Sequence, residues 1–267
     1  MRARKRLHDD FDAEATRASL DMVRQTVARY FRLEVHGAKN LPSGRSMVVG
    51  CHSGVVPYDA ACTLVAIEDA TGRLARAVGD MLFGQLELVE KYLRRRGAIV
   101  GRREEAADIL RAGNILLVFP GGAADMTRPI WRDAYRVLPH KGFAPGRGGY
   151  IKIALATQTP IVPLAVVGAE EAHMMLANLP LVARLFSVPF FPVLAFPFPL
   201  PVKLYIRFGK PIRFREGPQA AGDQKTVDRL SERVRRIVQE LIDDTRARRH
   251  GIILSEYDDA PKKSRRR

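Results

Sequence analysis

The fold is decided by residues 47–59, MVVGCHSGVVPYD, in which an apolar run ends in a turn that carries His52 and Asp59. A second apolar run, residues 115–118, ends in a comparable turn, Phe119-Pro120-Gly121-Gly122. Short apolar runs bounded by turn residues are typical of the buried strands of a parallel sheet. Because ligands bind at the carboxyl ends of such strands, both turns are expected to contribute to one site.

Strand-like and helix-like patterns alternate through most of the chain. Strands are expected at residues 32–35, 47–51, 75–78, 98–100, 114–119, 161–167 and 203–208, and helices at residues 12–31, 59–70, 81–96, 104–111, 150–157 and 226–246. This alternation predicts an α/β fold: a single domain with a central, mostly parallel sheet flanked by helices. We expect an N-terminal amphipathic helix within residues 1–31, the main domain in residues 32–250 and a basic tail in residues 251–267.

The composition limits the class of protein. The chain has 267 residues, of which 46% are hydrophobic, and a formal net charge of +15. This length and apolar content support a packed core and argue against a disordered chain. The charge predicts attraction to nucleic acid, anionic lipid surfaces or phosphate-rich cofactors. Part of it lies at the two chain ends, which are interpreted either as solvated tails or as membrane anchors.

Cysteine usage and apolar segments bear on the compartment. Cys51 and Cys62 fit neither a disulfide framework nor a zinc site, and are interpreted as core residues of a reducing compartment. No signal peptide is expected, because the charged N-terminus is not followed by an apolar stretch. Residues 186–202 contain five prolines, which exclude a membrane-spanning helix, and five phenylalanines. They form either a packed loop or an apolar lip that contacts a bilayer or an acyl chain.

His52 is the leading candidate for catalysis. A histidine held by a carboxylate is a general base suited to deprotonating a hydroxyl near neutral pH, and Asp59 would fix its tautomer. Alternatively, both residues only cap the following helix. Gly121 and Gly122 would let backbone N–H groups approach a phosphate or an oxyanion, or they form an ordinary turn. Arg103 follows a predicted strand end, where it would either clamp a phosphate or face solvent.

The ordered set of these motifs resembles the glycerolipid acyltransferase superfamily, of the lysophospholipid acyltransferase type. It is most similar to the bacterial branch related to mono- and diacylglycerol acyltransferases. Residues 52–59 resemble the first block of that family and residues 97–103 the second. Phe119-Pro120-Gly121-Gly122 resembles the third block and Ile161-Val162-Pro163-Leu164 the fourth.

The resemblance implies transfer of a fatty acyl group to a lipid hydroxyl from a thioester donor, with acyl-CoA or acyl-carrier protein as co-substrate. His52 would take the hydroxyl proton and Asp59 would orient it, so the reaction needs no metal, further cofactor or covalent enzyme intermediate. The residues then expected to contact substrate are Ser53, Gly54, Arg103, Phe119, Pro120, Gly121, Gly122 and Pro163. The implied setting is peripheral, at the cytoplasmic face of a membrane, through basic and apolar patches and without nucleic acid.

The chain departs from the family's pattern at two points. Six residues separate His52 from Asp59, where many members have four; the longer spacing is that of the neutral-lipid-like branch. The third block commonly carries Glu where this chain has Gly121, and the nearest carboxylate downstream is Asp125. Both departures favour a neutral acceptor, such as diacylglycerol or another lipid alcohol, over lysophosphatidate. Residues 140–148 also look extended relative to the family.

Two other functions stay open on the sequence alone. In a non-catalytic basic protein that binds lipid or nucleic acid, the charge would be the function and His52 would be a helix cap; no nucleic-acid-binding motif supports the second partner. A hydrolase with Ser53 as nucleophile is less favoured. Adjacent residues on a turn rarely reach each other, and the Gly-x-Ser-x-Gly elbow is missing.

Overall fold

The apolar runs form a sheet in the computed structural model, which describes residues 10–79, 87–100, 103–131, 134–185 and 190–249. Within these ranges the central sheet has seven strands. They are β1 (Glu34–His36), β2 (Ser46–Val49), β3 (Ala75–Gly79), β4 (Ile99–Val100), β5 (Ile115–Val118), β6 (Ile161–Val167) and β9 (Tyr205–Phe208). Each lies within two residues of a predicted strand.

The strand order, β1-β9-β6-β2-β5-β3-β4, makes the sheet mostly parallel. From β6 to β4 every neighbouring pair is parallel, whereas β9 runs antiparallel to β6 and is parallel to β1. This confirms the predicted α/β class. In the register of the central strands, Val49 lies opposite Val118. The turns after β2 and β5 therefore leave the sheet side by side.

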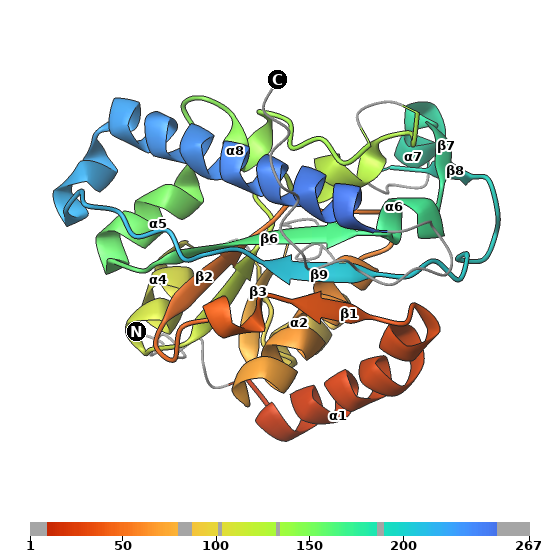
Figure 1. Cartoon of the computed structure of the whole chain (residues 1–267), viewed down its shortest axis with the longest axis horizontal. Helices are drawn as coiled ribbons and strands as arrows, with labels where there is room; N and C mark the ends of the chain where they lie inside the picture. Colours follow the sequence, from red (N-terminus) through yellow and green to blue (C-terminus); the bar gives the residue numbers. More distant parts are fainter. Residues whose placement is uncertain (1–9, 80–86, 101–102, 132–133, 186–189, 250–267) are drawn as a thin grey trace.

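Helices cover both faces of the sheet (Figure 1). They are α1 (Ala13–Val23), α2 (Tyr58–Thr71), α3 (Glu87–Arg95), α4 (Arg103–Arg111), α5 (Gly149–Thr157), α6 (Ala169–Ala172), α7 (Pro180–Leu185) and α8 (Gln224–Arg248). The expected helix at residues 12–31 is α1 continued by a π-helical turn, Arg24–Ala28. Part of the expected helix at residues 81–96, and the whole of the predicted basic tail, lie outside the described residues.

The two faces of the sheet belong to two apolar clusters. Met47 and Val49 of β2 pack in the cluster that contains α4, α5 and α8, whereas Val48 packs in the cluster that contains α2. All four residues of β2 and all seven of β6 are buried. Burial on both faces explains why these strands read as continuous apolar runs rather than as alternating patterns.

Part of the fold escapes the sequence patterns. A second sheet pairs β7 (Met175–Asn178) with β8 (Pro192–Leu194) in antiparallel fashion. The described part of the Pro- and Phe-rich segment therefore includes a strand and is not simply a loop. Two 3₁₀ turns, Gly122–Thr127 and Lys141–Phe143, lie between the predicted strand at residues 114–119 and the predicted helix at residues 150–157, where no element was expected. Among the described residues, no helix is long and apolar enough to cross a membrane.

Candidate active site

His52 and Asp59 meet at the carboxyl edge of the sheet. His52 lies in the turn after β2, and Asp59 lies in the first turn of α2. The Asp59 side chain is fully buried, and its Oδ2 lies 2.8 Å from Nδ1 of His52. The two carboxylate oxygens also accept hydrogen bonds from the backbone N–H groups of Ser53, at 2.9 Å, and Ala60, at 2.7 Å. These donors, together with the helix N-terminus, hold the carboxylate where it fixes the His52 ring.

The first and third sequence blocks are joined at the His52 ring. The Phe119 ring stacks on it with a centroid distance of 4.0 Å and an interplanar angle of 20°. The His52 side chain retains 14% of its exposure. With Nδ1–H donated to Asp59, the Nε2 lone pair is the position that can accept a proton. The ring is thus restrained on one face and at one nitrogen.

The neighbours of His52 are fixed by backbone geometry. Ser53 is buried, its N–H is used by Asp59, and its Oγ has no hydrogen-bond partner among the described residues. Gly54 has a φ of +86°, and a Cβ there would lie 2.5 Å from the carbonyl oxygen of Ala169. The turn therefore requires glycine at position 54 to pack against α6.

The third-block turn is closed by its own backbone. The N–H of Gly122 donates to the carbonyl of Phe119 at 3.0 Å, and the carbonyl of Pro120 accepts from the N–H of Gly142 at 2.8 Å. In this conformation the Gly122 N–H is occupied by a turn hydrogen bond. Of the two glycines, Gly121 is therefore the candidate whose N–H would donate to an oxyanion.

Two expected site residues are not brought to His52 by a described contact. Arg103 begins α4, and its side chain lies outside the description. Pro163 lies inside β6, opposite Val49, and its carbonyl accepts from the N–H of Gly209. Pro163 therefore acts in the sheet, at the position where β6 pairs with both β2 and the chain after β9.

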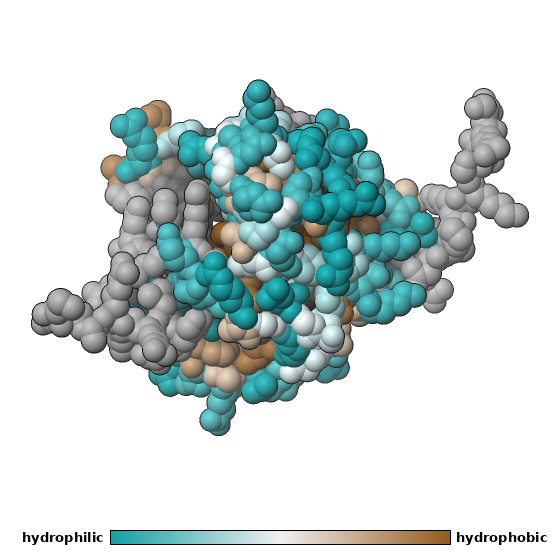
Figure 2. Space-filling model, turned by 90° about the vertical axis from the view of Figure 1, so that its left-hand side faces the viewer, coloured by the Kyte–Doolittle hydropathy of each residue, from teal (hydrophilic) through white to brown (hydrophobic). Residues whose placement is uncertain are grey.

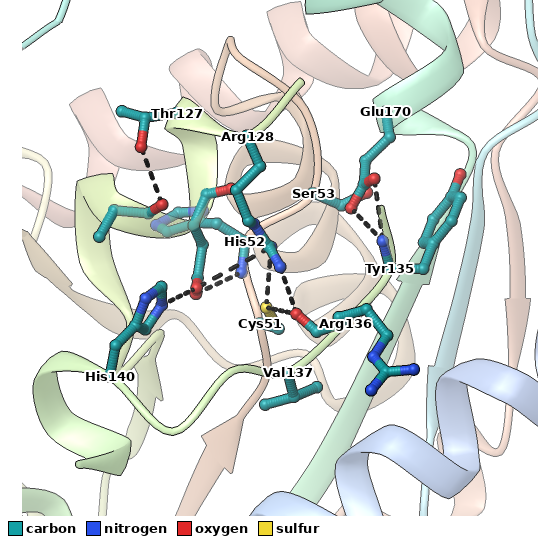
Figure 3. A network of polar contacts seen from close by, with 12 residues as sticks. Cys51, His52, Ser53, Thr127, Arg128, Tyr135, Arg136, Val137, His140 and Glu170 are labelled. Atoms are coloured by element: carbon teal, nitrogen blue, oxygen red, sulfur yellow. Dashed lines mark hydrogen bonds and ion pairs between the residues drawn. The ribbon is translucent and has the colours of Figure 1, made fainter. Parts of the chain in front are cut away.

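A polar network behind His52 contains residues that sequence reasoning did not place in the site (Figure 3). Asp125, which is 4% exposed, accepts from the backbone N–H of His52 at 3.3 Å and lies 2.6 Å from Nε2 of His140. Arg128 donates to the backbone carbonyls of Asp125 and Arg136 and to the sulfur of Cys51. The sequence signals for this network were the carboxylate four residues downstream of Gly121, the extended segment that begins at His140, and Arg128, which could be interpreted either as a phosphate clamp or as a solvent-facing residue.

Burial raises the pKa of two groups in or near this network, Glu170 and Cys51. Burial raises the pKa of Glu170 to about 7, against the opposing effect of Arg128. Both Glu170 oxygens accept from the N–H of Tyr135, at 3.0 and 2.9 Å. Burial also raises the pKa of the Cys51 thiol well above its usual range. A thiol in this state is a poor nucleophile, so His52 has no activated cysteine beside it.

Two grooves on the molecule lie away from His52. A groove of about 830 Å³ lies between α8 and the chain after β9, and one of about 450 Å³ lies between α8 and Arg136–Pro139. His52 lines neither of them. Across the ranges that the structure describes, no three His, Cys, Asp or Glu side chains gather in a metal-binding group.

Comparison with known proteins shows the family of the chain. Residues 32–167 match the Acyltransferase family. An uncharacterized protein of Mycobacterium leprae is 38% identical over 226 residues, which cover 80% of this chain and 60% of that protein. A mouse protein named DGAT1/2-independent enzyme synthesizing storage lipids is 28% identical over 214 residues, covering 79% of this chain and 59% of its own length. This chain thus spans about 60% of the length of the curated relatives it matches.

A solved structure has the same fold. The crystal structure of the 1-acyl-sn-glycerophosphate (LPA) acyltransferase PlsC from Thermotoga maritima superposes with a TM-score of 0.57 at 19% identity, covering 94% of this chain and 86% of that one. The family match runs from the residues before β1 to the last residue of β6, and so includes both turns at the His52 site. The chain therefore belongs to the Acyltransferase family and carries an acyltransferase domain.

Proposed function

We propose that this chain transfers a fatty acyl group from a thioester donor, acyl-CoA or an acyl-carrier protein, to the hydroxyl of a lipid. The observation that carries the proposal is the 2.8 Å contact between His52 and the fully buried Asp59, within an acyltransferase domain. A helix cap needs only hydrogen bonds from backbone N–H groups. Asp59 also contacts the ring of His52 in the preceding turn, which capping does not require. A non-catalytic basic lipid-binding protein is the alternative that the experiment below separates.

The proposed reaction uses His52 as the general base and then the general acid. Nε2 accepts the proton of the lipid hydroxyl while the hydroxyl oxygen attacks the thioester carbonyl carbon. The tetrahedral intermediate collapses with cleavage of the carbon–sulfur bond, and the proton on Nε2 passes to the leaving thiolate. Asp59 keeps the imidazole in the required tautomer and stabilises its cationic form. The N–H of Gly121 is the candidate donor to the oxyanion.

We propose a neutral lipid alcohol as the acceptor. Arg128 contacts the His52 turn through Cys51, and its guanidinium is already bound by two backbone carbonyls and the Cys51 sulfur. A guanidinium engaged in this way is a poor clamp for an acceptor phosphate. Asp125 and Glu170 add carboxyl groups to the same region, which disfavours an anionic acceptor further.

The test is an acyl-transfer assay with purified protein, radiolabelled acyl-CoA or acyl-carrier protein, and a panel of neutral and phosphorylated lipid acceptors. We expect an acylated neutral lipid with the wild type and a loss of about 10³-fold or more in His52→Ala. His36→Ala, which removes a histidine of β1 that contacts Glu34, is the matched control. Product formation that survives His52→Ala would refute the assignment. Vesicle binding without product from any donor would favour the lipid-binding alternative.

We further propose that the protein works at an anionic membrane surface, on the cytoplasmic side. Large apolar side chains that are at least 38% exposed lie on α7, on β7 and on the loops next to β7 and β8: Trp131, Leu176, Leu179, Leu181, Leu185, Phe191, Phe196 and Phe198. We call this set the apolar edge. A hydrogen bond from Ile130 to Met175 connects the loop after β5 to β7. The apolar edge therefore adjoins the loop that carries Phe119.

The rest of the surface supports membrane contact through the apolar edge. The elements of the apolar edge lie at one end of the molecule in Figure 1, whereas the other end, which faces the viewer in Figure 2, is mostly hydrophilic. Exposed apolar patches of this kind mark contact sites, and a net charge of +15 favours an anionic leaflet. Sedimentation with anionic vesicles tests the proposal: Leu181→Ser with Phe198→Ser is expected to release the protein. Met22→Ser, at another exposed apolar position, on α1, is the control and is expected to stay bound.

A further inference from the structure

The carboxylate of Asp125 lies in the space that a side chain at position 121 would fill. A Cβ built on Gly121 would be 2.1 Å from Oδ2 of Asp125 and 2.3 Å from its Cγ and Oδ1. No real side chain approaches another this closely. Glycine at position 121 and the buried carboxylate at position 125 are therefore a matched pair: each position limits what the other can hold.

From this space, Asp125 holds the main chain of the His52 turn. Its Oδ2 accepts from the backbone N–H of His52 at 3.3 Å, across 73 positions of sequence. Asp59 holds the ring of the same histidine at Nδ1. His52 is thus restrained at its backbone by one carboxylate and at its ring by another.

Asp125 is itself held by the chain segment that looked extended in the sequence. His140 places Nε2 at 2.6 Å from Oδ1 of Asp125. The N–H of Gly142 donates to the carbonyl of Pro120, which binds the segment to the third-block turn. The N–H of Gly146 donates to the carboxylate of Asp228 at 2.9 Å, which fastens it to α8. The segment therefore brings a histidine to Asp125 and anchors it on the long C-terminal helix.

We propose that Asp125 is a positioning residue for the acyl-transfer reaction: seated beneath Gly121 and clamped by His140, it sets the backbone position of His52. The proposal rests on the proposed function of His52 as the base. A displacement of the base by about 1 Å can lower the rate of such a reaction by about 100-fold, because the reacting atoms must meet in a narrow range of geometry. Substrate binding depends much less on this displacement, so the effect is expected in kcat rather than in KM.

The test is a double-mutant cycle on Gly121→Ala and Asp125→Ala. The added methyl of Gly121→Ala displaces the carboxylate, so each single variant is expected to lower kcat by about 10- to 100-fold with KM changed by less than about twofold. Once the carboxylate is absent, the methyl meets little, so the double variant is expected to be no slower than Asp125→Ala. Single effects that multiply in the double variant, or that appear in KM alone, would overturn the proposal.

Matched controls separate positioning from general damage. Gly44→Ala adds a methyl that meets nothing within 4 Å, and Asp108→Ala removes an exposed carboxylate of α4. Both are expected to keep the wild-type kcat. If Asp125→Ala does not fold, His140→Ala carries the test, because it removes the clamp from a partly exposed position. A several-fold fall in kcat supports the proposal, and an unchanged kcat contradicts it.

A readout independent of activity covers failure of the proposed function. In protein labelled with ¹⁵N at its six histidines, the His52 amide resonance is assigned by its loss in His52→Ala. Loss of a carboxylate acceptor is expected to move this resonance in the same direction in Gly121→Ala and in Asp125→Ala, and not in Gly44→Ala. An unmoved resonance would refute the positioning role even if acyl transfer is found; a moved one would support it even if no acyl transfer is found.

Discussion

Asp59 and Asp125 both contact His52, but they hold it in different ways. Asp59 lies seven positions along the chain, in the helix that follows the His52 turn, and accepts from the ring and from two backbone N–H groups. Asp125 comes from another strand end, accepts from the His52 backbone, and depends on His140 and on the missing side chain of Gly121. One carboxylate is locally built, and the other is assembled from three distant segments. We expect Asp59 to set the tautomer of the His52 ring and Asp125 to set the position of the His52 backbone.

Asp59→Asn gives the largest expected effect and separates these two roles. The amide has nearly the same shape, but it cannot stabilise the imidazolium and it favours the wrong tautomer, so kcat is expected to fall by about 10⁴-fold. This exceeds the effect expected at Asp125 by about 100- to 1,000-fold. The measurement is steady-state acyl transfer across the two variants, with melting curves to confirm folding.

Asp69→Asn is the control for this variant, because it changes an exposed carboxylate of the same helix that pairs with Arg24. It is expected to leave kcat near the wild-type value. A loss of less than tenfold in Asp59→Asn, or a larger loss at Asp125, would reverse the order of the two carboxylates.

The difference between the two carboxylates also explains what the sequence could predict. The His52–Asp59 pair was predictable because both residues lie in one strand–turn–helix unit, where spacing fixes proximity. Strands β2 and β6 were predictable because burial on both faces leaves continuous apolar runs. These local signals were sufficient for the α/β class and for the expectation that the turns after β2 and β5 lie at one edge of the sheet; the stacking of the Phe119 ring on His52 was not predicted.

The Asp125 network carried only weak signals in the sequence: the carboxylate downstream of Gly121 and the extended segment that begins at His140. Its contacts join residues 73 and 15 positions apart, and its seat is defined by an atom that Gly121 lacks. The β7–β8 sheet was missed for a related reason: its strands are short, one begins at Pro192, and they pair outside the main sheet. Such features depend on tertiary packing, which overrides local propensity.

Glu170 is a further buried carboxyl group, and it accepts hydrogen bonds from fewer donors than Asp59. The hydrogen bonds described for it both come from the N–H of Tyr135, and burial raises its pKa to about 7. The folded pKa lies above the ordinary value of 4.5, so the folded state binds the proton more tightly. The resulting stabilisation is fully present below about pH 4.5 and is lost as the pH rises through 7, by at most about 3 kcal/mol.

Glu170→Gln is expected to remove this pH dependence, because glutamine stays neutral. Urea unfolding at pH 5, 6, 7 and 8 should show the free energy of unfolding of the variant gaining on the wild type as the pH rises. Glu104→Gln, at an exposed position on α4, is the control and should run parallel to the wild type. If the Glu170→Gln curve also runs parallel, the Glu170 carboxyl is ionised in the folded protein at all of these pH values.

Asp223, a carboxylate at the protein surface, gives the smallest expected effect. It is the N-cap of α8 and accepts from the N–H groups of Lys225 and Thr226 and from the Thr226 hydroxyl. It therefore has as many donors as Asp59, yet no catalytic group among them. Asp223→Ala is expected to lower the melting temperature by about 2–4 °C and to leave kcat unchanged, because a lost helix cap weakens the helix end alone. A fall in kcat would mean that α8, which holds the His140 segment through Asp228, transmits its stability to His52.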